Sequence, residues 1–499
     1  MADLKDYGAQ WREEWAVVQR VKGPSAKNSS VFYRNIEEEL DISRQVGLSF
    51  PIHTPSHIMD FSSCDTLGMG ATGLLREEFL NELDANPGFQ LGASGSRLLD
   101  GTTEYQLMFE KEMAELMGVE SALVVHSGAT ANQAIFSTIP RSGDVIVYDE
   151  LMHATALTGM KSSLALEQIP FRHNDVDHFI ETLEAVKEST PLVKEGKRCV
   201  LIAVESWYSM DGDICPLKEL IDAAKEIFPR GNAQFIVDEA HSFGACGPEG
   251  KGFVAEQGLD DEIAVRMVTF TKALAGSGAC ILSNNTVRWL LINQAKVFIC
   301  SVAPPFTLLA SSRAGVRLMR SQKFQESRDY LHQLTTFYLD TLTSHPVYKK
   351  AYKKGLLKMP VHEDGSWHET PITHIVPLWT PRKKHALYLT FHLTRDGING
   401  CYIVFPIVGK GEDRVRLLLH AHNTKEQVMT LIDSIITWTQ EMLDIEASGD
   451  KNKLPSATRL AYDLIREDGG DGAEEANLFN PNSLNIQALG MVSSVNGNA

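Results

Sequence analysis

Short apolar runs that alternate with amphipathic stretches between residues 122 and 283 are the feature that most restricts the fold. The runs at 122–125, 144–148 and 198–205 have the length and composition of buried strands, and helical patterns separate them. Strands that alternate with helices form a mainly parallel sheet covered on both faces. The sequence therefore predicts a doubly wound α/β sheet.

A carboxylate and a lysine stand at the ends of two of these strands. The apolar run 235–237 leads into Asp238, and the next run ends in Thr-Phe-Thr-Lys, with the lysine at position 272. Ligands bind beyond the carboxyl ends of strands in such sheets. The pair suits pyridoxal 5'-phosphate (PLP): we expect Lys272 to form a Schiff base and Asp238 to keep the pyridine nitrogen protonated. Because an isolated Asp and Lys are more often a strand cap and a surface lysine, the interpretation depends on the neighbouring segments.

Two further segments place candidate residues at the same edge of the sheet. Ser127, Gly128 and Ala129 stand where a helix begins after the strand 122–125. Free N–H groups and the positive end of the helix dipole favour a phosphate there, although a Ser-capped helix start explains the pattern equally well. His153 follows the strand 144–148, where an imidazole can lie against a flat ring, although a lone histidine is more often a core residue.

Charge and composition exclude several classes of protein. The net charge is −17, and no basic stripe or Cys/His finger favours nucleic acid binding. The seven cysteines are scattered and form no CxxC pair, which indicates reduced thiols and a cytoplasmic location. No apolar run approaches the length of about 18 residues that a membrane span needs. The charged start lacks the pattern of a signal peptide, and the chain end is not a peroxisomal address.

Composition changes along the chain predict four parts. We expect an N-terminal arm at 1–57, a large PLP-binding domain at 58–320, a smaller α+β domain at 321–449, and a polar tail at 450–499. Gly, Asp, Glu and Asn dominate much of the tail, which favours disorder, although a helix pattern occurs near 456–466.

The motifs follow one another in an order that resembles the α-oxoamine synthase family of fold-type-I PLP enzymes. Its members include 8-amino-7-oxononanoate synthase, 5-aminolevulinate synthase, 2-amino-3-oxobutyrate CoA ligase and serine palmitoyltransferase. The resemblance covers roughly residues 58–440. It is carried by Gly-Ala-Ser-Gly-Ser-Arg-Leu (92–98), Ser-Gly-Ala-Thr-Ala-Asn-Gln-Ala (127–134), Asp-Glu-Leu-Met-His-Ala (149–154), Arg-His-Asn-Asp (172–175), Ser-Met-Asp-Gly-Asp (209–213), Val-Asp-Glu-Ala-His-Ser-Phe-Gly (237–244), Thr-Phe-Thr-Lys-Ala (269–273) and Arg-Val-Arg-Leu (414–417).

The resemblance implies three catalytic residues. Lys272 matches the Schiff-base lysine that also moves the proton at the substrate α-carbon. Asp238 matches the partner of the pyridinium nitrogen, since an opposite charge nearby favours the charged form. His153 matches the histidine that stacks on the ring. Arg416 matches the arginine that pairs with the amino acid carboxylate, a task that suits a planar guanidinium.

Further cofactor contacts are implied in the same way. Besides Ser127 at the helix start, the backbone of Gly128 and Ala129 matches the phosphate donors, and Thr269 adds a hydroxyl. Ser209 and His241 match groups near the phenolic oxygen of the ring. Ser301 stands where the family places a Ser or Thr that reaches the neighbouring subunit's phosphate, which implies a homodimer with shared active sites.

The implied reaction is a decarboxylative Claisen-type condensation of a small amino acid with an acyl thioester, which gives an α-amino ketone. Five positions depart from the family pattern: Cys64 replaces an Asn that helps to orient substrate, Gln106 a His, Ala129 an aromatic residue, and Leu418 and His420 two Thr residues. These departures suggest an unusual amino acid or acyl donor, on coenzyme A or a carrier protein, in a pathway of the secondary-metabolite type.

Two alternatives remain open. The first is a PLP enzyme that carries out transamination or simple decarboxylation. The second is a non-catalytic partner subunit, like the serine palmitoyltransferase subunit that lacks its lysine. The presence of Lys272, Asp238, His153 and His241 argues against the second alternative.

Overall fold

The computed structural model describes most of the chain. The described residues are 2–22, 29–45, 47–52, 58–359, 373–382, 384–405, 407–450 and 452–467. The predicted disorder of the tail beyond residue 467 concerns residues outside these ranges.

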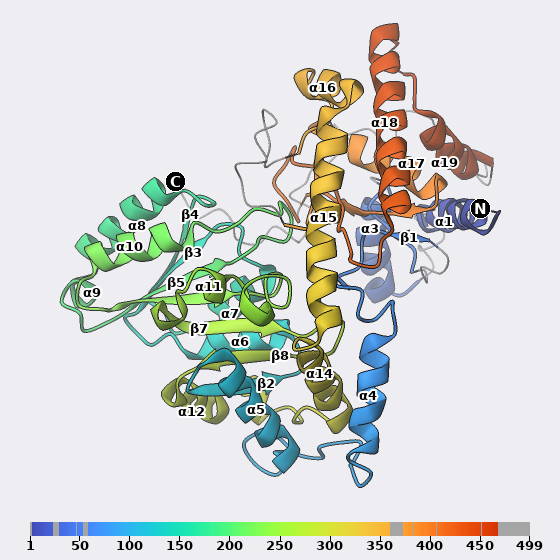
Figure 1. Ribbon diagram of the computed structural model, residues 1–499. Coiled ribbons are helices and arrows are strands. Elements are labelled where there is room, and N and C mark those ends of the chain that lie inside the picture. Colours follow the sequence, from blue (N-terminus) through green and yellow to red (C-terminus); the bar gives the residue numbers. More distant parts are fainter. Residues whose placement is uncertain are drawn as a thin grey trace.

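A seven-stranded sheet forms the centre of the molecule, in the order β2-β8-β7-β6-β5-β3-β4 (Figure 1). Neighbouring strands are parallel, except that β8 is antiparallel to β2 and to β7. The predicted doubly wound, mainly parallel sheet is therefore confirmed. The strands are β2 (Ser121–Val125), β3 (Val145–Asp149), β4 (Glu167–Phe171), β5 (Val200–Glu205), β6 (Ala233–Asp238), β7 (Ile263–Thr269) and β8 (Ala279–Ser283).

Helices cover both faces of this sheet because successive strand side chains point to opposite sides. Val145 and Val147 share a core with one set of helices, whereas Ile146 shares a core with the other. The first set is α8 (Val176–Ser189), α9 (Pro191–Lys194), α10 (Leu217–Ile227) and α11 (Phe253–Glu256). The second set is α6 (Gly128–Thr138), α7 (Ala154–Lys161), α12 (Asn285–Gln294) and α13 (Lys296–Ile299). Short 3-10 turns lie at Pro248–Gly250 and Asp260–Glu262.

A third core joins the β2 edge of the sheet to the remainder of the chain. It includes side chains of α5 (Glu104–Met117), α14 (Phe306–Leu318), α15 (Gln322–Ser344) and α18 (Lys425–Ser448), and α4 (Leu74–Asp84) packs along α14. Helix α15 runs from the side of the sheet to α16 (Pro346–Lys353) and α18 (Figure 1). It thereby links the two ends of the molecule.

The C-terminal part contains two small sheets. Strands β9 (Leu378–Trp379), β11 (Cys401–Ile403) and β12 (Arg414–Arg416) form an antiparallel sheet, and β1 (Met59–Asp60) pairs in parallel with β10 (Ile398–Asn399). Helix α17 spans His385–Arg395. The chain that follows β1 is bonded to the chain that follows β12, since the Leu418 amide donates to the Phe61 carbonyl at 2.8 Å.

Both ends of the described chain pack on α17. Trp11 and Trp15 of α1 (Ala2–Val18) form a core with Phe391, and Ala457 and Ala461 of α19 (Ser456–Glu467) complete it. Figure 1 shows α1, α17 and α19 side by side, with α3 (Val31–Gln45) nearby. Among the described residues, no helix is both long and apolar enough to cross a membrane.

Candidate active site

Asp238 and Lys272 lie at the same edge of the sheet, at the ends of adjacent parallel strands. Asp238 is the last residue of β6, and Lys272 follows the end of β7 by one tight turn. Burial lowers the pKa of the Lys272 amine, and the Asp238 charge opposes this shift. Because a lower pKa leaves more of the amine uncharged at neutral pH, Lys272 is suited to act as a nucleophile and proton acceptor.

Two donors fix the buried carboxylate of Asp238. Asn132 of α6 donates from Nδ2 to Oδ2 at 2.9 Å, and the Ala240 amide donates to Oδ1 at 2.9 Å. The Asn132 amide also donates to Thr155 Oγ1 at 3.1 Å. The carboxylate is thus aimed by α6, the same helix whose first turn is the predicted phosphate site. Asn132 belongs to a recognised motif, but the sequence assigns it no role.

His153 lies at the start of α7, where its side chain caps the helix. Nδ1 accepts the Thr155 amide at 3.2 Å and is 2.7 Å from Thr155 Oγ1. The walls of the site desolvate the imidazole and lower its pKa, while the Asp238 charge acts in the opposite direction. With Nδ1 as an acceptor, the neutral ring has a fixed tautomer and an exposed surface. This arrangement fits a ring that stacks on a flat cofactor.

The first turn of α6 has the properties of a phosphate cradle. Ser127 is the N-cap and accepts the Thr130 amide at 3.1 Å. The N–H groups of Gly128 and Ala129 belong to the first turn, where no helical carbonyl can accept them. They fit the phosphate of PLP. The hydroxyl of buried Thr269, in contrast, already lies 3.2 Å from the Gly278 carbonyl.

Two buried histidines, one of them unpredicted, line the site on the side of Lys272. His241 lies near His374, with 6.5 Å between ring centroids. Burial and the charge of Lys272 lower the pKa of His241 well below its usual range. Burial lowers the pKa of His374 to about 3. Both imidazoles are therefore neutral at pH 7 and are available to hydrogen-bond a ligand. The sequence missed His374, which lies in an unremarkable apolar segment.

Glu205 is a second buried carboxyl group that the sequence did not identify. It ends β5 and is paired in register with Asp238 of β6. Burial and the Asp238 charge raise the pKa of Glu205 well above its usual range. Glu205 therefore holds its proton more firmly than an exposed carboxyl group does.

The loop that carries Ser209 is attached to the small antiparallel sheet. Arg414 of β12 forms a buried ion pair with Asp211 and donates to the Met210 carbonyl at 3.2 Å. Its guanidinium also lies over the Trp379 ring, 4.6 Å from the centroid. These contacts fix the loop on which the half-buried Ser209 lies, next to Met210.

Arg416 has the features of a carboxylate-binding residue. It lies on β12 and is 9% exposed, yet Nε has no hydrogen-bond partner among the described residues. The Cys64 thiol contacts the guanidinium only weakly, with Sγ 4.0 Å from Nη2. A buried guanidinium without a carboxylate partner is costly unless a ligand supplies one. The carboxylate of an amino acid substrate fits this requirement.

Gln106 and Ser301 lie apart from this group of residues. Gln106 is fully buried and donates to the Val124 carbonyl at 3.4 Å. Ser301 is exposed on the surface of the single chain. Ser301 is thus available to a neighbouring molecule rather than to its own site.

Comparisons with known proteins identify relatives of this chain. The family description Aminotransferase class I and II matches residues 56–435. An aminoacyl transferase sphA of Aspergillus fumigatus is 43% identical over 90% of this chain and 96% of its own length. An 8-amino-7-oxononanoate synthase of Emericella nidulans is 39% identical over 78% and 91% of the two chains. A serine palmitoyltransferase structure from S. paucimobilis, with PLP and myriocin bound, has a TM-score of 0.65, 25% identity, and coverage of 77% and 87%.

The fold and the residues at the strand ends define a fold-type-I PLP enzyme. The chain belongs to the α-oxoamine synthase family, within the aminotransferase class I and II group. The predicted family, fold and cofactor are confirmed. So is the prediction that the protein is a PLP-dependent acyltransferase of the α-oxoamine synthase type.

Proposed function

We propose that this enzyme condenses a small amino acid with an acyl thioester, releases carbon dioxide and a thiol, and forms an α-amino ketone. Bound PLP supplies an electron sink for the substrate α-carbon. The observation that carries the proposal is the presence, in one site, of a Lys272 amine with a lowered pKa and a buried Arg416 whose Nε has no hydrogen-bond partner among the described residues.

The side chains divide the work of binding and proton transfer. Gly128 and Ala129 hold the phosphate, His153 supports the ring, and Asp238 pairs with the pyridine nitrogen. Arg416 binds the amino acid carboxylate, which positions the α-hydrogen for removal by the uncharged amine of Lys272. In the condensation, a carbon–carbon bond forms at the α-carbon, the carbon–sulfur bond of the thioester breaks, and the carboxylate leaves as carbon dioxide.

The acyl donor is proposed to be an unusual chain of the kind found in secondary metabolism. The most direct support is the 43% identity to an aminoacyl transferase, a name different from those of the primary-metabolism relatives. The departure at Cys64 lies 4.0 Å from Arg416, the proposed substrate arginine, and adds to this support. Coenzyme A and carrier proteins are both compatible donors.

The enzyme is further proposed to act as a homodimer in the cytoplasm. Large apolar side chains are exposed near Ser301: Leu91 is 72%, Leu99 is 70% and Val302 is 58% exposed. A bridge between Ser96 and Val302 joins these segments, so they form one surface beside Ser301. When a second copy of the chain covers this surface, Ser301 of one copy lies toward the phosphate site of the other copy. The free cysteines fit a reducing compartment.

The test is an assay with purified protein, PLP, and alanine, serine or glycine in combination with acyl thioesters on coenzyme A or a carrier protein. Condensation releases thiol and carbon dioxide in equal amounts and gives an amino ketone that mass spectrometry identifies. Carbon dioxide without thiol would indicate a decarboxylase. Transfer of the amino group to an oxo acid would indicate an aminotransferase. A protein that fails to bind PLP would support the non-catalytic alternative.

A further inference from the structure

We propose that His420 is a positioning residue that holds the segment 60–64 against β12 and thereby shapes the amino acid subsite at Arg416. The proposal rests on the proposed function, because it assigns Arg416 to the substrate carboxylate. It concerns two departures from the family pattern, Cys64 and His420, and gives them a common physical reason.

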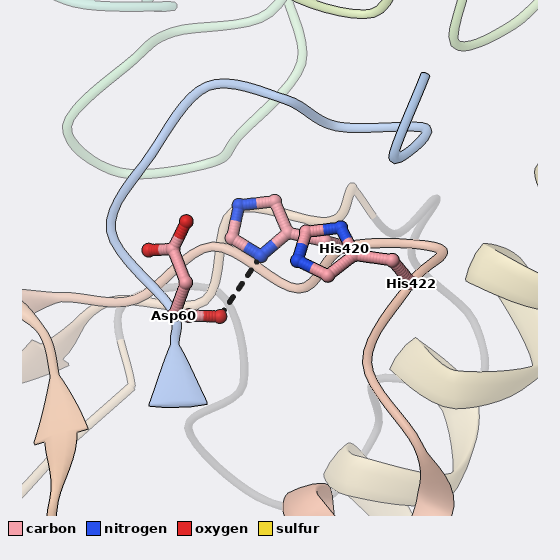
Figure 2. Close-up of side chains that lie close together, drawn as sticks. All are labelled: Asp60, His420 and His422. Carbon is pink, nitrogen blue, oxygen red and sulfur yellow. Dashed lines mark hydrogen bonds between the residues drawn. The ribbon is translucent and has the colours of Figure 1, made fainter. Parts of the chain in front are cut away.

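His420 is fully buried, and both of its ring nitrogens face carbonyl oxygens. Nε2 is 2.8 Å from the Ser63 carbonyl, and Nδ1 is 3.1 Å from the Asp60 carbonyl. Figure 2 shows the contact between the His420 ring and the Asp60 carbonyl. Carbonyl oxygens only accept hydrogen bonds, and a neutral imidazole carries one N–H, so the ring donates from one nitrogen at a time to the segment that begins at β1.

Asn423 reinforces this attachment. Its side chain donates from Nδ2 to the Asp60 carbonyl at 3.1 Å, and its Oδ1 accepts the His420 amide at 2.9 Å. The backbone contributes two more bonds, since Leu418 donates to Phe61 at 2.8 Å and Ala421 donates to Thr66 at 3.0 Å. The segment is therefore attached to residues 418–423 on both sides of Cys64.

Cys64 itself cannot supply this attachment. A thiol is a weak donor and a weak acceptor, whereas the Asn that is usual at this position has a strong amide. The Cys64 sulfur lies 4.0 Å from Arg416 Nη2, a contact too weak to use the donors of the guanidinium. Because the Cys64 side chain does not hold the segment 60–64 in place, we infer that His420 holds it instead. Arg416 is then left free for the substrate carboxylate.

The same residues resemble a metal site at first sight. One ligand atom from each of Asp60, His420 and His422 lies within 4.8 Å of the other two, and the two imidazoles stack with 4.9 Å between centroids (Figure 2). However, both His420 nitrogens already face carbonyl oxygens. The Asp60 carboxylate also accepts the amides of Ser62 and Ser63 at 2.9 and 3.0 Å. The cluster is therefore better explained as an attachment between segments.

The test compares His420→Leu, His420→Gln and the neighbouring control His422→Gln in the full-length protein. The first readout is the alkylation rate of Cys64 by iodoacetamide, followed by peptide mass spectrometry with and without PLP. The exposed Cys300 serves as an internal reference. The second readout is the spectral titration of the PLP-loaded enzyme with amino acid, together with KM and kcat.

In His420→Leu we expect Cys64 to react about tenfold faster and the amino acid KM to rise about tenfold, the effect of losing one buried hydrogen bond. The kcat should change much less. His420→Gln keeps one donor and should recover part of both effects, and His422→Gln should match the wild type. His420→Gln also serves as the test if His420→Leu does not fold.

Unchanged Cys64 reactivity and unchanged amino acid affinity in folded His420 variants would overturn the proposal. Equal effects in His422→Gln would do so as well, since they would indicate a general loss of packing. If the wild-type enzyme forms no amino ketone, the proposed function fails. The alkylation rates and the amino acid titration would still test the role of His420.

Discussion

The side-chain amide of Asn132 donates a hydrogen bond to the carboxylate of Asp238 at 2.9 Å. Asn132 lies one turn into α6, and Asp238 ends β6. The helix that begins at the phosphate cradle thus also aims the partner of the pyridine nitrogen. Under the proposed assignment, one rigid element would position both ends of the cofactor, which favours a preorganised site.

Asn132→Ala is expected to weaken PLP binding about tenfold, since it removes a hydrogen bond to a buried charged group worth about 1.5 kcal/mol. Equilibrium dialysis against PLP measures the effect. Gln133→Ala, at the exposed neighbouring position, is the matched control and should bind PLP normally. Normal PLP affinity in Asn132→Ala would show that Asp238 does not depend on this contact.

Arg416→Ala is expected to raise the amino acid KM about 10- to 100-fold, because hydrogen bonds to charged groups contribute about 1.5–3 kcal/mol. PLP affinity should remain unchanged, since Arg416 is assigned to the substrate alone. Arg416→Lys keeps the charge but not the planar fork and should recover only part of the loss. Steady-state kinetics with varied amino acid checks this expectation. An unchanged KM would place the carboxylate elsewhere.

Arg414→Met is expected to destabilise the protein by about 3–5 kcal/mol, because it leaves the buried carboxylate of Asp211 without its partner. Urea unfolding measures the loss. In the double variant Arg414→Met with Asp211→Asn, no unpaired charge remains, so much of the stability should return. A double variant no more stable than the single one would show that stacking on Trp379 matters more than the ion pair.

His173 gives the enzyme a pH-dependent stability at alkaline pH. Its ring lies between Asp149, at 2.9 Å, and Asp213, at 2.6 Å. Although burial acts against the charged form, the two carboxylates raise the pKa of His173 to about 10. The unfolded chain titrates near 6.5. The ion pairs therefore stabilise the fold fully below about pH 6.5, and this contribution is lost as the pH rises through about 10.

Unfolding free energies measured at several pH values between neutrality and about pH 10 should show this loss. In His173→Gln the curve should be flatter over that range, because the titrating group is gone. A wild-type curve that is already flat would contradict the raised pKa of His173.

The sequence predicted the sheet and the edge at which the site lies, because both follow from local patterns. Apolar runs of strand length identify β2, β3, β5, β6 and β7, and side chains that follow parallel strands must meet at one edge. Asn132 and His374 were missed for the opposite reason. Their roles depend on contacts with Asp238 and His241, more than 100 residues away, which no local pattern records.

The small C-terminal part was predicted less completely. The sequence predicts a smaller α+β domain there, but not the core that α17 forms with Trp11, Trp15 and α19, its partners at the two ends of the chain. The sequence alone showed that Cys64 and His420 depart from the family pattern. Their physical connection appears only when the chain after β1 is bonded to residues 418–423, which follow β12.

The most direct test of the account is a comparison of the wild-type enzyme with Lys272→Ala, both loaded with PLP. The wild type should show the visible absorbance of the lysine-bound cofactor. It should also release thiol from an acyl thioester in the presence of one small amino acid. Lys272→Ala should retain PLP but lose this absorbance and form no amino ketone. Product formation by Lys272→Ala at the wild-type rate would contradict the central claim.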